Sequence, residues 1–187
     1  MTSRREDTPG DQRPSDDHAR FTALVREHQR GLFAHVRVVY PYADADAVVN
    51  ETFIAAWQRI DVVPADRAGT WLRTTARYVV MNGRRGERRR QALTDRVARL
   101  DPVAHAPAPD HDAGIELQLV MDALASLTAA DREVLLMTAL DDLSPDDLGE
   151  ILGIRPNAAK TRVSRARARL RAAVAADEPS QTEGGTR

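Results

Sequence analysis

Residues 144–171 constrain the fold of this chain more than any other segment, because they predict two helices joined by a sharp turn. Ser144 is a favoured N-cap residue, and Pro145 suits the first position of a helix. Gly153 permits the left-handed backbone conformation in which a helix often ends. In the segment that follows, five apolar residues recur at helical spacing and predict one buried stripe: Ala159, Val163, Ala166, Leu170 and Val174. The pattern is typical of a helix-turn-helix.

The second of these helices carries six cations and no acid. All six fall outside the predicted apolar stripe: Lys160, Arg162, Arg165, Arg167, Arg169 and Arg171. A helix that is packed on one side and cationic on the others is typical of helices that enter the major groove of DNA. A solvated surface helix is the alternative, but acids normally alternate with cations on such a helix. We therefore expect a DNA-binding helix.

Helical periodicity also covers the N-terminal half of the chain. The apolar positions there predict three helices, over residues 19–40, 44–60 and 68–90. Three helices of this length can enclose a small core. We expect Trp57 and Trp71 to belong to that core, since large aromatic side chains at helical spacing are mostly buried.

The remaining segments divide the chain. Residues 91–115 lose the periodicity and contain three prolines, so they predict a flexible linker. Residues 1–17 and 175–187 are polar and are expected to be disordered tails. Helical spacing returns at residues 117–127, and Thr128 can cap a further helix that runs to about Leu140. No segment shows the period of a strand. The sequence therefore predicts an all-α protein with two small helical domains, residues 18–90 and 116–174.

The predicted third helix is also strongly basic. Residues 71–99 hold nine arginines against two acids. Four of the arginines lie within an arc of about 60° on an α-helix: Arg73, Arg77, Arg84 and Arg88. A cationic stripe of that length matches the spacing of a phosphate backbone, and Tyr78 and Asn82 on the same helix can contact bases. An ordinary exposed arginine-rich helix is the alternative interpretation.

Composition narrows the function further. The net charge is −1, so the chain has no excess of cations. Its positive and negative residues are instead concentrated in separate segments. The absence of cysteine excludes disulfides, thiolate zinc sites and thiol catalysis. No nucleophile–base pair, glycine-rich phosphate loop or metal-ligand pattern stands out, so we predict no cofactor, no metal and no enzymatic activity. Without a signal peptide or a long apolar run, the expected location is cytoplasmic, with no membrane insertion.

Three motifs, in one order, resemble the sigma-70 family of bacterial RNA polymerase sigma factors. The matching segments are Ala45–Trp57, Trp71–Arg77 with the basic run Arg84–Arg90, and Leu148–Arg167. The first two resemble parts of region 2 and the last resembles region 4. The resemblance covers residues 21–174. Its spacing and the absence of other conserved regions indicate the small extracytoplasmic-function (ECF) group.

The resemblance implies a factor that binds core RNA polymerase and directs promoter recognition, DNA opening and initiation. In the family, region 2 docks on the clamp helices of the β′ subunit, and the residues implied here are Asp46, Asn50 and Glu51. The third helix recognises the −10 element, and the residues implied are Arg73, Arg77, Asn82, Arg84, Arg85 and Arg88. Region 4 sits on the β flap and reads the −35 element, and the residues implied are Arg155, Asn157, Ala158, Lys160, Thr161, Arg162 and Arg165.

The resemblance also suggests secondary roles. Residues 64–67 are expected to border a pocket for a flipped base. The later arginines of the last helix are expected to contact phosphates or to stay solvated: Arg167, Arg169 and Arg171. Four acids in and beside the linker suit the RNA exit path by charge mimicry, with a solvated tether as the alternative: Asp101, Asp110, Asp112 and Glu116. An anti-sigma factor is an expected partner.

Two other functions compete with this interpretation. A stand-alone helix-turn-helix regulator explains residues 116–174, but leaves the basic third helix and residues 45–57 without a role. An architectural nucleic-acid binder uses arginines for phosphates without choosing a sequence. A sigma factor differs from both in needing core polymerase to bind its promoter.

Overall fold

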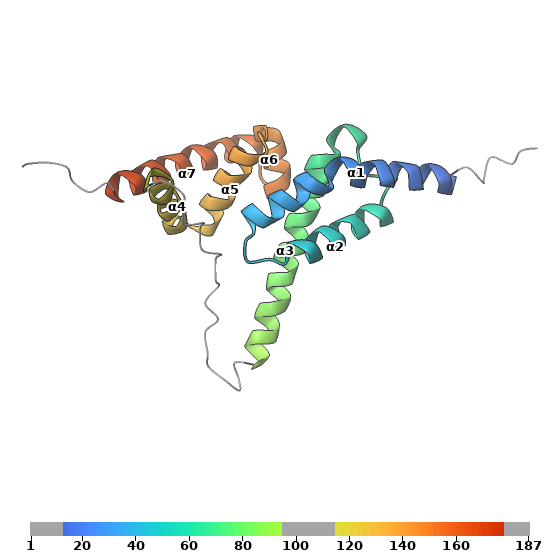
Figure 1. The fold of residues 1–187 in the computed structure, drawn as a ribbon, viewed down its shortest axis with the longest axis horizontal. Coiled ribbons are helices and arrows are strands. Elements are labelled where there is room, and N and C mark those ends of the chain that lie inside the picture. The colour runs from blue at the N-terminus through green and yellow to red at the C-terminus, as the bar shows by residue number, and fades with distance from the viewer. Residues whose placement is uncertain (1–12, 95–114, 178–187) are drawn as a thin grey trace, which may run out of the picture. The chain divides into compact units, whose positions relative to one another are not determined.

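The computed structural model describes residues 13–94 and 115–177, and all regular structure within those residues is helical (Figure 1). The elements are α1 (Arg13–Val39), α2 (Ala45–Gln58), the short 3-10 helix η1 (Ala65–Arg67), α3 (Ala68–Thr94), α4 (Ile115–Ser126), α5 (Ala129–Leu140), α6 (Pro145–Leu152) and α7 (Pro156–Asp177). The chain divides into two compact units, with α2 and α3 in the first and α4 to α7 in the second. Helix α1 belongs to the first unit up to Arg37, and residues 38–42 are grouped with the second. The prediction of an all-α fold with two helical units is confirmed.

Several helix ends differ from the sequence prediction. Helix α1 begins at Arg13, so residues 13–17 are helical although a disordered tail was expected. A proline is tolerated in the first turn of a helix, and Asp16 there interacts favourably with the helix dipole. Helix α3 continues to Thr94, four residues into the predicted linker. Residues 95–114 of that linker, with Asp101, Asp110 and Asp112, lie outside the described residues, as does the side chain of Glu116.

The first unit has a core of apolar side chains from all three helices. Leu24 and Leu32 of α1, Val48, Phe53 and Ala56 of α2, and Leu72, Ala76 and Val80 of α3 are buried. Trp71 is half-buried, but the expectation of a buried Trp57 is wrong, since 44% of that residue is exposed. Helix α2 has apolar residues around most of its circumference, and one side of a helix cannot bury them all.

The second unit shows the local signals that its sequence predicts. Thr128 caps α5, and Ser144 caps α6 by accepting a hydrogen bond from the Asp147 N–H at 3.1 Å. Gly153 ends α6 with a φ of 66°. Gly149 allows the turn to close, because an added Cβ would lie 2.9 Å from the Ile154 carbonyl oxygen.

Helices α4 and α5 are joined through one arginine. Arg132 Nε donates to the Leu124 carbonyl at 2.8 Å, and its Nη2 donates to the carbonyls of Ala125 and Leu127 at 2.6 and 3.1 Å. These carbonyls lie at or just after the C-terminal end of α4, where a helix lacks the N–H donors of a following turn. A cation there also interacts favourably with the helix dipole. None of the helices in residues 13–94 and 115–177 has both the length and the hydropathy that crossing a membrane requires.

Candidate nucleic-acid interface

Helix α7 is held by its unit along one side only. It packs against α4, α5 and α6, and Ala159 and Ala166 on that side are fully buried. Val163, Leu170 and Val174 of the predicted stripe are half-buried. At about 100° per residue, the opposite side of the helix carries four exposed residues: Asn157, Thr161, Ser164 and Ala168. Small and polar side chains on the open side of a helix allow close approach to base edges.

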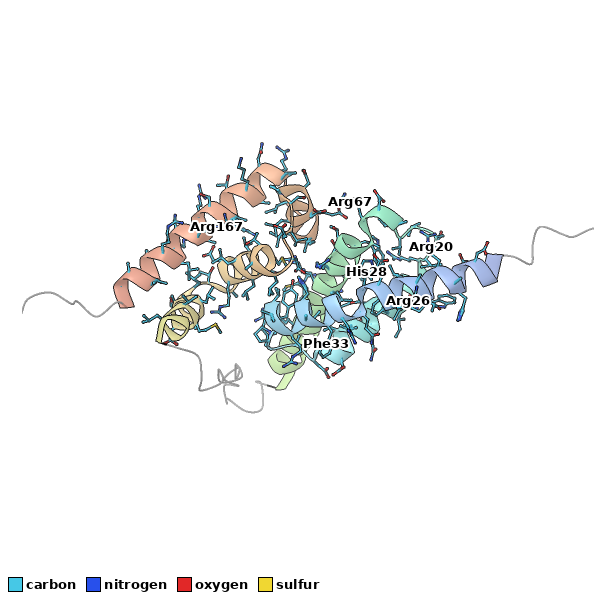
Figure 2. The ribbon with its side chains drawn as sticks, turned by 45° about the horizontal axis from the view of Figure 1, so that its top comes forward. Arg20, Arg26, His28, Phe33, Arg67 and Arg167 are labelled. Atoms are coloured by element: carbon cyan, nitrogen blue, oxygen red, sulfur yellow. The ribbon has the colours of Figure 1, made fainter. Side chains whose placement is uncertain are left out.

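The cations of α7 form two rows, one along each edge of this open side. The first row lines a groove of about 700 Å³ next to the start of α5 and consists of Arg162, Arg165 and Arg169. The second row lines a groove of about 470 Å³ next to the start of α6 and consists of Lys160, Arg167 and Arg171 (Arg167 is labelled in Figure 2). The two rows lie about 180° apart around the helix. The open side is therefore flanked by positive charge on both edges.

The residues implied in reading a −35 element are not all in one place. Five of them line the first groove together: Asn157, Ala158, Thr161, Arg162 and Arg165. Arg155 is exposed and lies just before α7 begins. Lys160 lies in the other groove, since the helical step turns it toward the α6 side. Helical spacing puts Lys160 on a different edge of α7 from Arg162 and Arg165, but it leaves open which helix borders each edge.

A buried carboxylate forms part of the wall of the first groove. The Asp131 side chain is 7% exposed, and its Oδ2 accepts hydrogen bonds from Thr128 Oγ1 at 2.8 Å and from Arg169 Nη1 at 2.7 Å. Burial raises the pKa of this carboxyl, but the hydrogen bonds from Thr128 and Arg169, with the charges of Arg169 and Arg162, bring it below its ordinary value. The expectation that Arg169 contacts phosphate or stays solvated missed this ion pair, which joins residues 38 positions apart.

Helix α3 presents two different sides. Asn82, Tyr78 and Trp71 line a cleft of about 480 Å³ between α2 and α3, and Tyr78 is 66% exposed. Arg73 and Arg77, which begin the arginine stripe, are centred about 140° around the helix from the direction of these three residues.

The arginines of this stripe and its neighbourhood differ in exposure. Arg73 and Arg77 are half-buried, whereas Arg84 and Arg85 are exposed. Arg73 packs over the α3 backbone, because an added Cβ at Gly69 would lie 3.0 Å from its Nη1. The side chain of Arg88 lies outside the described residues. Exposed guanidinium groups are therefore concentrated in the later turns of the described part of α3.

The outer side of α2 combines polar and apolar residues. Asp46 and Asn50 are exposed there, next to Ile54 at 58% and Trp57 at 44% exposure. A groove of about 620 Å³ runs along this side, and its lining residues are His18, Phe21, Asn50, Phe53, Ile54, Trp57 and Gln58. Glu51 is exposed at the other edge of α2, in the cleft with α3.

Sequence reasoning missed Ile54 and Trp57 as surface residues. The available signal was the excess of apolar residues on α2 over what one buried side can hold. Trp57 is held by edge contacts, with its ring centroid 5.1 Å from that of Phe21 and 6.1 Å from that of His18. An exposed apolar patch with a polar rim is typical of a protein–protein interface.

The loop between α2 and α3 is tied to α1. Arg20 Nη2 donates to the carbonyl of the buried Val63 at 2.6 Å, just before residues 64–67. Pro64 is half-buried, and Ala65–Arg67 form the exposed helix η1 (Arg20 and Arg67 are labelled in Figure 2). This loop, predicted to border a base pocket, is therefore held at its start by a side chain from another helix.

Two family models match the chain, Sigma-70 region 2 over residues 24–90 and Sigma-70, region 4 over residues 117–170. Among curated proteins, RNA polymerase sigma factor NccH of Alcaligenes xylosoxydans xylosoxydans is 31% identical over 162 residues, which cover 83% of this chain and 87% of NccH. ECF RNA polymerase sigma factor SigL of Mycobacterium tuberculosis is 31% identical over 148 residues, which cover 78% of this chain and 83% of SigL.

Solved structures are similar over most of the chain. The sigma factor RpoE in complex with the anti-sigma factor NepR from Bartonella quintana matches with a TM-score of 0.65 and 26% identity, covering 84% of this chain and 98% of that one. CnrH in complex with the cytosolic domain of CnrY matches with a TM-score of 0.55 and 31% identity, covering 90% of this chain and 92% of that one.

Proposed function

The chain belongs to the extracytoplasmic-function group of the sigma-70 family of RNA polymerase sigma factors, and on that premise we propose how its two helical units divide the work of directing transcription initiation. The second unit reads the −35 element, and the first unit binds core polymerase and the −10 element. The observation that carries this proposal is the open side of α7, flanked by a cationic row on each edge.

In the second unit, α7 lies in the major groove of the −35 element. Asn157 and Thr161 face base edges, where amide and hydroxyl groups can form hydrogen bonds. Ala158 cannot hydrogen-bond a base and offers a methyl group for apolar contact instead. Cations from both rows, Arg162 and Arg165 on one edge and Lys160, Arg167 and Arg171 on the other, contact the phosphates on either side of the groove and fix the register of the helix.

In the first unit, the cleft beside α3 receives an unpaired base near the −10 element. Tyr78 supplies an exposed ring for stacking and Asn82 supplies hydrogen-bonding groups. Arg84 and Arg85 contact the backbone of the same strand. Residues 64–67 contribute from the loop that Arg20 holds in place.

Core polymerase binds the outer side of α2. Asp46 and Asn50 supply polar contacts on that side, and Glu51 supplies one from the edge of α2 that borders α3. Ile54 and Trp57 supply apolar area that can be excluded from water. An anti-sigma factor is the second partner that we propose, supported by the similarity to RpoE and CnrH, which were solved with NepR and CnrY. An inhibitor that covered Ile54 and Trp57 would exclude the polymerase from them.

The test is transcription in vitro with purified core RNA polymerase and genomic DNA, followed by mapping of the start sites. We expect discrete start sites that share two upstream elements and that vanish when this protein is omitted. The protein alone should show no preference for these promoters over random DNA. Sequence-specific binding without polymerase, together with no dependent start site, would support a stand-alone regulator instead.

A further inference from the structure

The ion pair between Asp131 and Arg169 lies where DNA is expected, and it divides the first cationic row. Arg162, Arg165 and Arg169 line the same groove as Asp131. Arg169 Nη1 is 2.7 Å from Asp131 Oδ2. Within the described residues, the side chains of Arg162 and Arg165 have no hydrogen bond or ion pair. One cation of the row is therefore paired within the protein, and the side chains of the other two are available to DNA.

Asp131 is fixed more firmly than a surface acid would be. Its N–H donates to Thr128 Oγ1 at 3.2 Å, and Thr128 Oγ1 donates to Asp131 Oδ2 at 2.8 Å, so the capping of α5 holds the carboxylate in place. The side chain is 7% exposed, whereas that of Arg169 is 58% exposed. The acid cannot move into solvent without undoing the start of α5.

This asymmetry decides which partner Arg169 keeps. A DNA phosphate at the protein surface stays hydrated when it loses one cation. A buried carboxylate that loses its cation is left as an uncompensated charge, which is among the most costly arrangements in a protein. Arg169 would therefore lose free energy by leaving Asp131 to bind a phosphate.

We propose that Asp131 is a positioning residue that withholds Arg169 from DNA, so that Arg162 and Arg165 alone make the phosphate contacts on this edge of α7. The inference rests on the proposed placement of α7 in the −35 element. The neutral pair also keeps the negative charge of Asp131 from repelling the approaching phosphates.

The test measures holoenzyme binding to a mapped promoter fragment over a range of salt concentrations. The logarithm of the affinity falls with the logarithm of the salt concentration, and each phosphate contact that is lost reduces the magnitude of this negative slope by about 0.9. We expect D131N/R169Q, which replaces one neutral pair by another, to retain the wild-type slope. D131N alone should release Arg169 to a phosphate and steepen the slope by about 0.9, whereas the matched control R165Q should reduce it by about 0.9.

The outcomes separate this inference from the proposed function. A reduced slope in both D131N/R169Q and R165Q would show that Arg169 is a phosphate contact, and would overturn the inference alone. An unchanged slope in R165Q would overturn the proposed placement of α7, and the inference with it. Thermal melting identifies variants whose second unit does not fold. If thermal melting shows that D131N/R169Q does not fold, the salt slope of D131N is the test. An unchanged slope in D131N then contradicts the inference.

Discussion

The junction between α4 and α5 provides a prediction whose size follows from the structure. Arg132 donates three hydrogen bonds, at 2.6 to 3.1 Å, to carbonyls at the end of α4. Hydrogen bonds that involve a charged group contribute about 1.5–3 kcal/mol each to stability. The three share one guanidinium and the bond to Ala125 is exposed, so they do not add in full. We expect R132Q to lower the free energy of unfolding of the second unit by about 2–4 kcal/mol.

The assay must separate the two units. Both tryptophans, Trp57 and Trp71, lie in the first unit, so their fluorescence reports on that unit alone. Hydrogen exchange of peptides from α5 reports on the second unit, and far-ultraviolet circular dichroism during urea unfolding follows the helices of both units. R132Q should shift the circular dichroism transition and the exchange while leaving the fluorescence transition in place.

A matched control is available in the same unit. The side chain of Arg155 is exposed and has no hydrogen bond or ion pair within the described residues. R155Q should therefore change stability by less than about 0.5 kcal/mol. R132K keeps the charge but cannot hold three carbonyls in one planar fork, so its stability should lie between the other two variants. If R132Q is as stable as R155Q, the carbonyl bonds do not support this junction.

Three further predictions follow from burial, backbone geometry and charge. W57A should weaken binding to core polymerase by about 30-fold or more in a fluorescence titration, whereas Y78A, which removes an exposed ring from α3, should leave that affinity within about threefold. G149A should destabilise the second unit by about 1–3 kcal/mol because of its 2.9 Å contact, whereas G31A, with open space around it, should be neutral or stabilising by about 0.5–1 kcal/mol in urea unfolding. The pKa of Asp131 is lower in the folded protein than its ordinary value of 3.8, so its stabilising contribution should be complete above that pH and be lost as the pH falls below it. D131N should remove this part of the acid dependence in an unfolding series from pH 6 to pH 2; an unchanged dependence would contradict the assignment.

Local signals account for the elements that the sequence determined. The caps at Thr128 and Ser144 and the turn at Gly153 depend on residues within a few positions of one another, and the structure has them as predicted. The stripe of α7 follows from the 3.6-residue period, which sets the side of a helix on which each residue lies. The family motifs are likewise contiguous segments. These features are decided by neighbours along the chain, so they can be predicted from it.

Only the tertiary structure decided which sides of the helices are covered. Trp57 is part of an apolar pattern, but other residues of α2 fill the core of the first unit. The ring of Trp57 therefore stays at the surface. Lys160 and Arg165 belong to one cationic run, yet different helices border them. Arg169 is neutralised by Asp131 because α5 packs on α7. Contacts between residues far apart in the chain carry no local periodicity, and that is why the sequence alone determined the helices but not which of their charged and apolar side chains remain available to partners.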